Sequence, residues 1–204
     1  MALPSTTRLF PGFERLYVFS DPGSQRDFVA SIDLSIDQAL EALRGNPVSR
    51  PITAKWKMGD SAPGDVIWTT LAIPVLVSEK IVGLLREKEI TGWDARPIDL
   101  FDGAKRLLAG YYLLEVRGRC GPIEDSRSAI SQKNYPRGSF PVWRGLYFDP
   151  NSWDGSDVFT PAGNVAWIFL TQQVKRVFEG ARLGNVLFTA ANRIERTHLD
   201  HPPT

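Results

Sequence analysis

Two stretches of the chain carry the same order of apolar and polar positions, 93 residues apart. Residues 73–98 and residues 167–190 each open with a short apolar run, pass a hydroxyl residue at Ser78 or Thr171, and continue with a helical period. The apolar stripe consists of Val174, Val177, Phe178 and Ala181 in the second stretch and of Ile81, Leu84 and Leu85 in the first. Lys88 takes the fourth place in the first stretch. These spacings predict one amphipathic helix in each stretch.

The signals around the two predicted helices also agree in register. Ser78 and Thr171 belong to the residue types that cap the first turn of a helix. Gly92 and Asn185 follow the helices, and both types tolerate the left-handed conformation that ends a helix. Extended runs then cover residues 93–98 and 186–190. Each stretch therefore predicts strand–helix–strand, and their agreement favours a duplicated module over a chance match of a common unit.

Other elements are predicted outside the repeat. Residues 15–19 and 110–116 have strand patterns. Ser35-Ile36-Asp37-Gln38 has the form of a capping box that opens a helix, and Gly45 ends it. Strict alternation of apolar and polar residues over 52–58 predicts a strand with one buried and one solvent-exposed face. The side chains on its buried face would be Ile52, Ala54, Trp56 and Met58.

Two stretches give no regular pattern. Residues 121–140 are polar and contain Pro122, Pro136 and Gly138, which predicts a mobile excursion or a binding loop. The tail that begins at Glu195 is expected to be disordered.

Together these elements predict an α+β protein with mixed, largely antiparallel sheets, a few short helices and two similar strand–helix–strand modules. We expect one compact domain overall. Its predicted segments are an N-terminal α+β segment at 1–64, the first repeat module at 65–116, a loop-rich connector at 117–156, the second repeat module at 157–194 and a disordered tail at 195–204.

Composition narrows the class of protein. A chain of 204 residues that is 43% hydrophobic can bury a substantial core without cross-links. Its one cysteine excludes an internal disulfide and fits a reducing compartment. The first residues contain no apolar signal sequence, and the longest apolar runs are far shorter than the roughly 20 residues needed to cross a bilayer. We therefore expect a soluble, cytoplasmic protein with no membrane partner.

Charge is uneven along the chain although the net charge is only +1. The middle, residues 104–144, holds eight basic and three acidic residues. This excess suits an acidic partner or a phosphate backbone, while a solvated face is the simpler explanation. A nucleic-acid partner is not expected because the stretch has no recognisable nucleic-acid motif. The basic residues are Lys105, Arg106, Arg117, Arg119, Arg127, Lys133, Arg137 and Arg144.

Candidate chemistry is sparse. Cys120 has cationic neighbours, but the two histidines, His198 and His201, lie in the tail and offer it no positioned base. With Asp200 they would form a metal site only if the tail were rigid. Asp149, Asn151 and Asp154 depart from the spacing of a calcium loop and are interpreted as a turn. We therefore assign no catalytic, cofactor-binding or metal-binding residue and expect no cofactor.

The six tryptophans supply the candidates for partner binding. Most are expected in the core, but Trp143 and Trp153 stand beside turn residues, and an exposed tryptophan near Arg144 would be a plausible interface anchor. The predicted contact residues are Trp143, Arg144, Trp153, Arg137 and Arg119.

The chain resembles the bacterial immunity proteins of polymorphic toxin systems. This large family, common in myxobacteria and other proteobacteria, was first catalogued as a domain of unknown function. The matching residues are the Val77-Ser78-Glu79-Lys80 entry, the helix ending Ile90-Thr91-Gly92, residues 93–97, the strand at 110–116 and a degenerate second module that begins at Asp157. The second module has Thr171-Gln172-Gln173 where an entry of the Ser-Glu-Lys type is usual.

The resemblance implies an α+β protein that is cytoplasmic in the producing cell and binds a cognate toxin without chemistry of its own. The first hypothesis is therefore a toxin-neutralising immunity protein that works by stoichiometric occlusion. An enzyme with its site between the two modules is the second hypothesis. A small-molecule or nucleic-acid binding module that uses the basic middle is the third.

Overall fold

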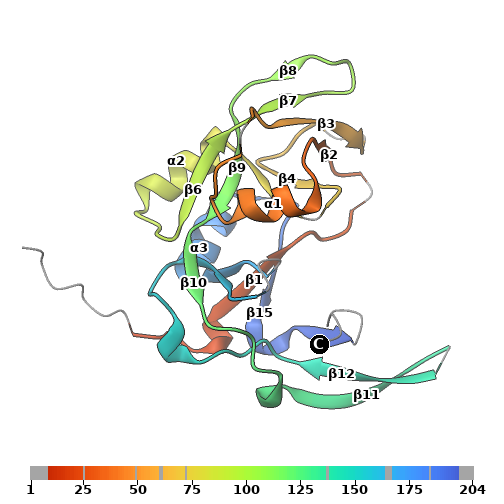
Figure 1. Ribbon diagram of the computed structural model, residues 1–204, viewed down its shortest axis with the longest axis vertical. Coiled ribbons are helices and arrows are strands. Elements are labelled where there is room, and N and C mark those ends of the chain that lie inside the picture. Colours follow the sequence, from red (N-terminus) through yellow and green to blue (C-terminus); the bar gives the residue numbers. More distant parts are fainter. Residues whose placement is uncertain are drawn as a thin grey trace, which may run out of the picture.

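The chain is α+β in the computed structural model, which describes residues 9–24, 26–48, 50–59, 62–71, 73–136, 138–163, 167–183 and 185–197. Within these residues three short helices lie among three sheets (Figure 1). Most strand pairs are antiparallel and a few are parallel. The predicted class, with mixed and largely antiparallel sheets, is therefore confirmed. No helix in the described residues combines the length and the apolar character that crossing a membrane requires.

The largest sheet curls around a core of its own. Its strands, in spatial order, are β6 (Trp93–Pro97), β9 (Tyr111–Val116), β5 (Leu76–Ser78), β4 (Val66–Thr69), β2 (Val29–Ile32), β3 (Thr53–Met58), β7 (Asp99–Phe101) and β8 (Leu107–Leu108). Only Ile98 separates β6 from β7, although β6 pairs with β9 and β7 pairs with β3. This continuity draws the two ends of the sheet together. The enclosed core includes Ile67, Leu76, Leu100 and Leu113.

Helix α1 (Ile36–Leu43) begins as the sequence predicts. The Ser35 hydroxyl accepts a hydrogen bond from the Gln38 backbone N–H at 3.2 Å, and the Gln38 side chain accepts one from the Ser35 N–H at 3.0 Å. These two bonds satisfy donors that the first turn would otherwise leave free. The helix packs beside β9 and contributes Ala42 to the core of the largest sheet.

The largest sheet forms the first half of the molecule, and the two smaller sheets form the second half. In spatial order the five-stranded sheet comprises β10 (Gly118–Cys120), β13 (Val158–Pro161), β14 (Phe169–Thr171), β1 (Leu16–Ser20) and β15 (Leu187–Ala190). The three-stranded sheet comprises β11 (Ala129–Tyr135), β12 (Gly138–Arg144) and β16 (Glu195–Thr197). A separate aromatic core, which includes Phe148, Phe159 and Phe169, packs in this half.

The two predicted modules pair in matching register. The first continues from β5 into helix α2 (Glu79–Glu87) and β6, and the second continues from β14 into helix α3 (Gln172–Gly180) and β15. Strand β9 lies between β5 and β6, just as β1 lies between β14 and β15. The equivalent pairs are Tyr112 with Val77 and Pro97, and Tyr17 with Leu170 and Ala190. This match is one of pairing; a common origin of the modules stays a prediction.

An aspartate accepts a hydrogen bond from the hydroxyl residue that precedes each of these helices. The Ser78 hydroxyl donates to Asp65 at 2.7 Å, and the Thr171 hydroxyl donates to Asp157 at 2.8 Å. Ser78 also accepts a hydrogen bond from the Ile81 N–H at 3.4 Å, so its predicted role as a cap is confirmed. Thr171 occupies the same position in α3, but its side chain makes no capping hydrogen bond in the described residues. That part of the prediction is wrong, because the hydroxyl is turned toward Asp157.

Each of the two helices ends at a left-handed residue, but not at the predicted one. The backbone angle φ is 50° at Glu89 and 56° at Arg182, two positions that are again 93 residues apart. The predicted stops, Gly92 and Asn185, come three residues later. Gly92 has a φ of 83°, and a side chain there would overlap the carbonyl oxygen of Val158. Glycine is therefore required at this position for close contact between the halves, not for ending the helix.

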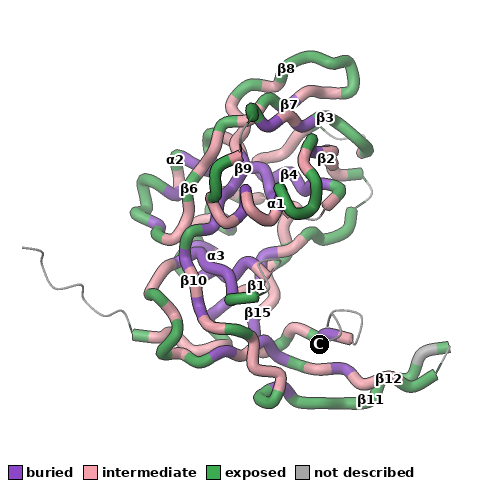
Figure 2. Tube along the Cα trace, in the orientation of Figure 1, coloured by how far each residue is buried: buried purple, intermediate pink, exposed green. Residues whose placement is uncertain are grey.

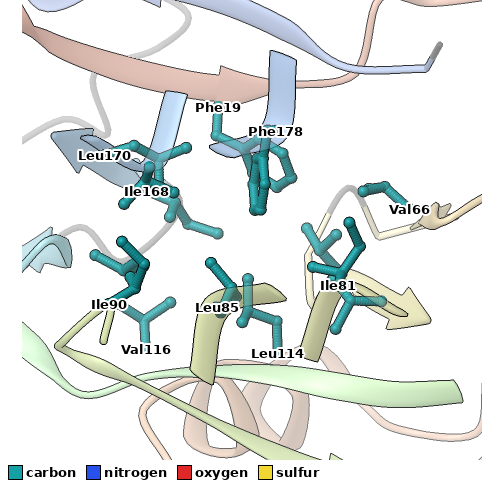
Figure 3. Packing of buried hydrophobic residues seen from close by; sticks show 14 of the residues in the cluster. Phe19, Val66, Ile81, Leu85, Ile90, Leu114, Val116, Ile168, Leu170 and Phe178 are labelled. Atoms are coloured by element: carbon teal, nitrogen blue, oxygen red, sulfur yellow. The ribbon is translucent and has the colours of Figure 1, made fainter. Parts of the chain in front are cut away.

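Helices α2 and α3 bury their apolar stripes in one core that belongs to both halves (Figure 3). Ile81 and Leu85 of α2 and Val174 and Phe178 of α3 are all fully buried there. Phe19 of β1 packs against Phe178, with ring centroids 5.8 Å apart. Because each such side chain contributes about 1.5–3 kcal/mol when buried, this shared core is a major source of stability.

The turn that follows each helix contacts the opposite half. The Thr91 hydroxyl donates to Asp157 at 3.0 Å, and the Val158 N–H donates to the Thr91 carbonyl at 3.0 Å. In the other direction, the Trp68 indole N–H donates to the Asn185 carbonyl at 2.8 Å. The side-chain amide of Asn185 donates to the backbone of β4. Each half therefore contributes one post-helix turn that forms hydrogen bonds with the other half.

Strand β3 departs from the predicted burial. Ile52 and Ala54 are buried as expected, but Trp56 is 41% exposed and Met58 is 49% exposed. Strand β7 pairs with β3 only as far as Lys55, so the last residues of β3 extend beyond this neighbour. The alternating pattern identified the face correctly but not the length over which that face is covered.

Two predicted irregular stretches form strands. Part of the polar stretch 121–140 lies in β11 and β12, which form a long antiparallel hairpin. The tail predicted to be disordered begins with β16, which pairs with β12. Both predictions are wrong there, because backbone pairing orders these segments without a strong apolar pattern. Residues 198–204 lie outside the described residues.

The predicted N-terminal segment, residues 1–64, contributes to both halves. Strand β1 is an interior strand of the five-stranded sheet, whereas β2, α1 and β3 belong to the first half. The second module is thus completed by a strand from the opposite end of the chain.

Two glycine substitutions should have opposite effects on stability. Gly83 lies exposed in α2 with open space around it, so Gly83→Ala should raise the free energy of unfolding by about 0.5–1 kcal/mol. Gly92→Ala should lower it by about 2 kcal/mol or more, because the methyl group meets Val158 and the backbone is left-handed. Urea unfolding of both variants measures the difference; equal effects would contradict the proposed contact between the halves.

Candidate partner-binding surface

The β11–β12 hairpin projects from the second half of the molecule (Figure 1). Its strands pair along their whole length, from Ala129 opposite Arg144 to Tyr135 opposite Gly138. Strand β11 forms one edge of the three-stranded sheet, and residues 129 and 131–134 are exposed along it together with Ile130 (Figure 2). The stretch from residue 126 to residue 148 contains four basic residues and no acidic one. The hairpin is therefore an exposed, positively charged extension of the fold.

A buried arginine fixes the base of the hairpin. Arg196 of β16 is only 3% exposed. Its guanidinium donates to the Asp125 carboxylate at 2.7 Å, to the Ser128 hydroxyl at 3.0 Å and to the Gly145 carbonyl at 3.2 Å. The Ser128 hydroxyl in turn donates to the same carbonyl at 2.9 Å. Such a connected polar network holds one arrangement of the segments that enter and leave the hairpin.

Arg127 adds a second attachment beside this network. Its guanidinium donates to the Phe148 carbonyl at 2.8 Å and lies 5.4 Å from the ring centre of Phe13 and 5.8 Å from that of Tyr147. The cation therefore joins the start of the hairpin to the aromatic core of this half.

Two of the predicted contact residues, Trp143 and Arg144, lie next to each other on β12. Trp143 is half-buried and Arg144 is exposed. Trp143 stands opposite Ile130, so the two side chains share one face of the hairpin. Ile130 is 64% exposed and was not predicted as a contact residue. Its position within a polar stretch gave no reason to assign it to a strand, and only the pairing places it beside Trp143.

The other two described contact residues have structural partners. The indole N–H of Trp153 donates to the Ser156 carbonyl at 3.0 Å, and its ring packs against Phe159 in the aromatic core. The guanidinium of Arg119 donates to the carbonyls of Val116 at 2.6 Å and Gly118 at 2.7 Å. Neither residue lies on the hairpin, and Trp143 and Arg144, as consecutive residues of a strand, point to opposite faces of it. Arg137, the fifth predicted residue, lies outside the described residues.

Arginines also close the end of helix α1. The three consecutive carbonyls that follow this helix each accept a hydrogen bond from an arginine of β6, the end of β9 or β10. The pairs are Arg44 with Arg119, Gly45 with Arg117, and Asn46 with Arg96. Arg96 and Arg117 also bind the buried carboxylate of Glu115, each at 2.5 Å. Part of the basic excess in the middle of the chain is therefore used within the fold.

Cys120 is buried on β10 in the aromatic half. Burial, with a smaller contribution from the charge of Asp154, raises the pKa of its thiol to about 12. A thiol that stays protonated is a poor nucleophile, so the interpretation of Cys120 as a passive residue has a physical basis. The other candidates, His198, Asp200 and His201, lie outside the described residues.

The turn that resembles a calcium loop uses its side chains locally. The Asp149 carboxylate accepts the Asn151 N–H at 3.0 Å, and that of Asp154 accepts the N–H of Arg119 at 2.7 Å and of Ser156 at 2.9 Å. These bonds support the interpretation of the segment as a turn.

A cavity of about 470 Å³ lies where the two halves meet α1. Phe19 and Ile168 line it from the second half, and Trp68 and Ile73 line it from the first half. Its lining is predominantly apolar, and Asp21 supplies the carboxylate that faces it. Such a lining is typical of a packing defect or an apolar ligand site.

No protein-family model matches the chain, and a search of curated proteins finds no match.

Removal of the buried arginine should destabilise the base of the hairpin. We expect Arg196→Ala to lower the free energy of unfolding by about 2–3 kcal/mol, because it leaves buried acceptors without their charged donor. Lys133→Ala is the matched control: its ion pair with Glu195 lies at the surface, so its removal should change the free energy of unfolding little. Urea unfolding measures both values; a loss at Arg196 no larger than that at Lys133 would contradict the role assigned to the network.

The thiol of Cys120 should react with Ellman's reagent only when the fold opens. At pH 8 we expect the native chain to be modified at least about a hundredfold more slowly than the chain in denaturant, because the thiolate fraction and access are both low. The chain has one cysteine, so the absorbance trace reports this residue alone. Similar rates in the two states would refute the assignment.

Proposed function

We propose that this chain is an immunity protein that binds a cognate bacterial toxin and blocks it by stoichiometric occlusion in the cytoplasm of the cell that makes both. The observation that carries the proposal is that the first-module residues of the family resemblance form one continuous structural unit. Val77 and Ser78 end β5, and Glu79 opens α2. Residues 93–97 are β6, and β9 lies between β5 and β6. The matching segments are thus assembled together and not scattered over the surface.

Occlusion is favoured by a surface that is ordered before the toxin arrives. A preformed surface avoids much of the conformational entropy that ordering a loop would cost on binding. The hairpin suits this requirement because its strands are fully paired and its base is held by Arg196 and Arg127. A stable complex of this kind buries about 1,200–2,000 Å² in total, so the hairpin would supply part of the interface and adjoining surface the rest.

The two other hypotheses draw less support. The enzyme hypothesis places a site between the two modules, where the cavity between Phe19 and Trp68 has a mostly apolar lining. A second cavity there, of about 320 Å³, is lined by Asp27, Asp65 and Arg182 among others, and Asp65 is already bound to Lys80 and Ser78. The nucleic-acid version of the binding hypothesis relies on the basic middle, where Arg117, Arg119 and Arg127 already bind carboxylate or carbonyl oxygens of the fold. Immunity by occlusion uses the hairpin without requiring chemistry at either place.

Co-expression tests the proposal. The product of the gene adjacent to this one should arrest growth of a bacterial host when it is induced alone, and co-expression of this chain should restore growth. The two proteins should also co-purify in a fixed ratio, which distinguishes occlusion from catalytic inactivation. A host that grows no better with this chain than without it would reject the proposed function.

A further inference from the structure

Most edge strands of the described sheets are built in ways that discourage pairing with another chain. Strand β8 has two residues, β10 and β16 have three each, and β15 has four. Strand β6 is longer, but it carries the charges of Asp94 and Arg96 and ends at Pro97. Short length, charge and proline are the usual means by which a sheet keeps its edges from joining other sheets.

Strand β11 is the edge strand that lacks these features. It has seven residues without a proline and pairs with β12 without a shift of register. Residues 129–134 are all exposed, and β11 lies on the side of the hairpin away from the rest of the molecule (Figure 1). In an antiparallel pair every second residue directs its N–H and C=O away from the partner strand. The edge of β11 therefore presents a row of backbone donors and acceptors that matches another extended strand.

The side chains of β11 do not oppose such pairing. Lys133 is its one charged residue, and it forms an ion pair with Glu195 of β16 at 2.9 Å. Ile130 is 64% exposed and adds apolar surface beside the edge. A strand with so little uncompensated charge suits a neutral strand as its partner, and β11 is itself such a strand.

Two copies of β11 are complementary in an antiparallel arrangement. A two-fold axis through Gln132 pairs all seven residues of one copy with all seven of the other. In this register Lys133 lies opposite Ser131, so the two lysines do not face each other directly. Closed two-fold dimers, in which both copies use the same surface, are the commonest assemblies of identical chains.

We propose that β11 is a dimerisation edge that pairs antiparallel with β11 of a second copy of this chain. The pairing joins the two three-stranded sheets into one continuous sheet. It uses the edge of the hairpin and leaves both of its faces open. The inference therefore goes beyond the proposed function and does not depend on it.

Sedimentation equilibrium of the purified chain tests the dimer. The unsubstituted chain should show a monomer–dimer equilibrium. Gln132→Lys and Gln132→Glu should each weaken dimerisation severalfold, because each places two like charges opposite one another at the two-fold axis. An equal mixture of the two variants should restore the dimer. The matched control is Ser139→Lys, which adds the same charge to an exposed residue of β12 and should dimerise like the unsubstituted chain.

Cysteine cross-linking tests the register. Residues directly opposite in an antiparallel pair have Cα atoms roughly 4.5–5.5 Å apart, which a disulfide can span. Gln132→Cys should therefore form a disulfide-linked dimer under mild oxidation. The control is Ala129→Cys on the same strand, whose two copies would lie about 20 Å apart along the strand and should stay unlinked. The native Cys120 is buried and does not compete.

Three results would overturn the inference. They are a chain that remains monomeric at about 100 μM, a dimer that neither Gln132 variant weakens, and equal cross-linking of the two cysteine variants. A mixture of the Lys and Glu variants that stays monomeric would also overturn it. These measurements use this chain alone, so their failure leaves the proposed function to be decided by co-expression.

Discussion

Helices α2 and α3 of the paired modules bury their apolar stripes in one core that both halves share, and this constraint organises the molecule. Ile81 and Leu85 are buried in the same cluster as Val174 and Phe178 of the other half. The shared core brings the post-helix turns into contact with the opposite strands, where Thr91 of one turn and Asn185 of the other bond across the boundary. Because these contacts are reciprocal, a change that separates the helices also releases both turns. The two halves should therefore unfold as one cooperative unit.

The halves resemble each other near this boundary and differ away from it. In the first half β6 runs on into β7, which pairs with β3, and α1 covers the core that results. In the second half β15 leads instead to β16, which pairs with the hairpin strand β12. The first half is therefore closed on itself, whereas the second is extended by an element with no counterpart in the first. The candidate binding surface lies on that extension, whose residues are not needed for packing between the halves.

Local signals in the sequence predicted much of the fold. The capping box at Ser35, the helical stripes and the central strand at 110–116 all depend on short-range chemistry, and each forms as expected. The errors arise where distant segments decide the outcome. Strand β11 is polar, so nothing but pairing identifies it, and Trp56 is exposed because its neighbour ends early. Helix α2 ends at the left-handed Glu89, and Gly92, which is also left-handed, instead allows close contact with Val158. The candidate site was missed in part for the same reason.

Strand β1 has a further consequence for how the protein is made. It leaves the ribosome among the first segments, yet the two strands that flank it, β14 and β15, are synthesised about 150 residues later. Until then its buried side chains, Leu16, Val18 and Phe19, have no sheet to join. The first half can begin to assemble meanwhile, because its strands are contiguous from β2 to β9. Translation should thus produce a first half that is only partly assembled, because its share of the common core is still uncovered, together with an unpaired apolar strand. Such a state is a target for chaperones.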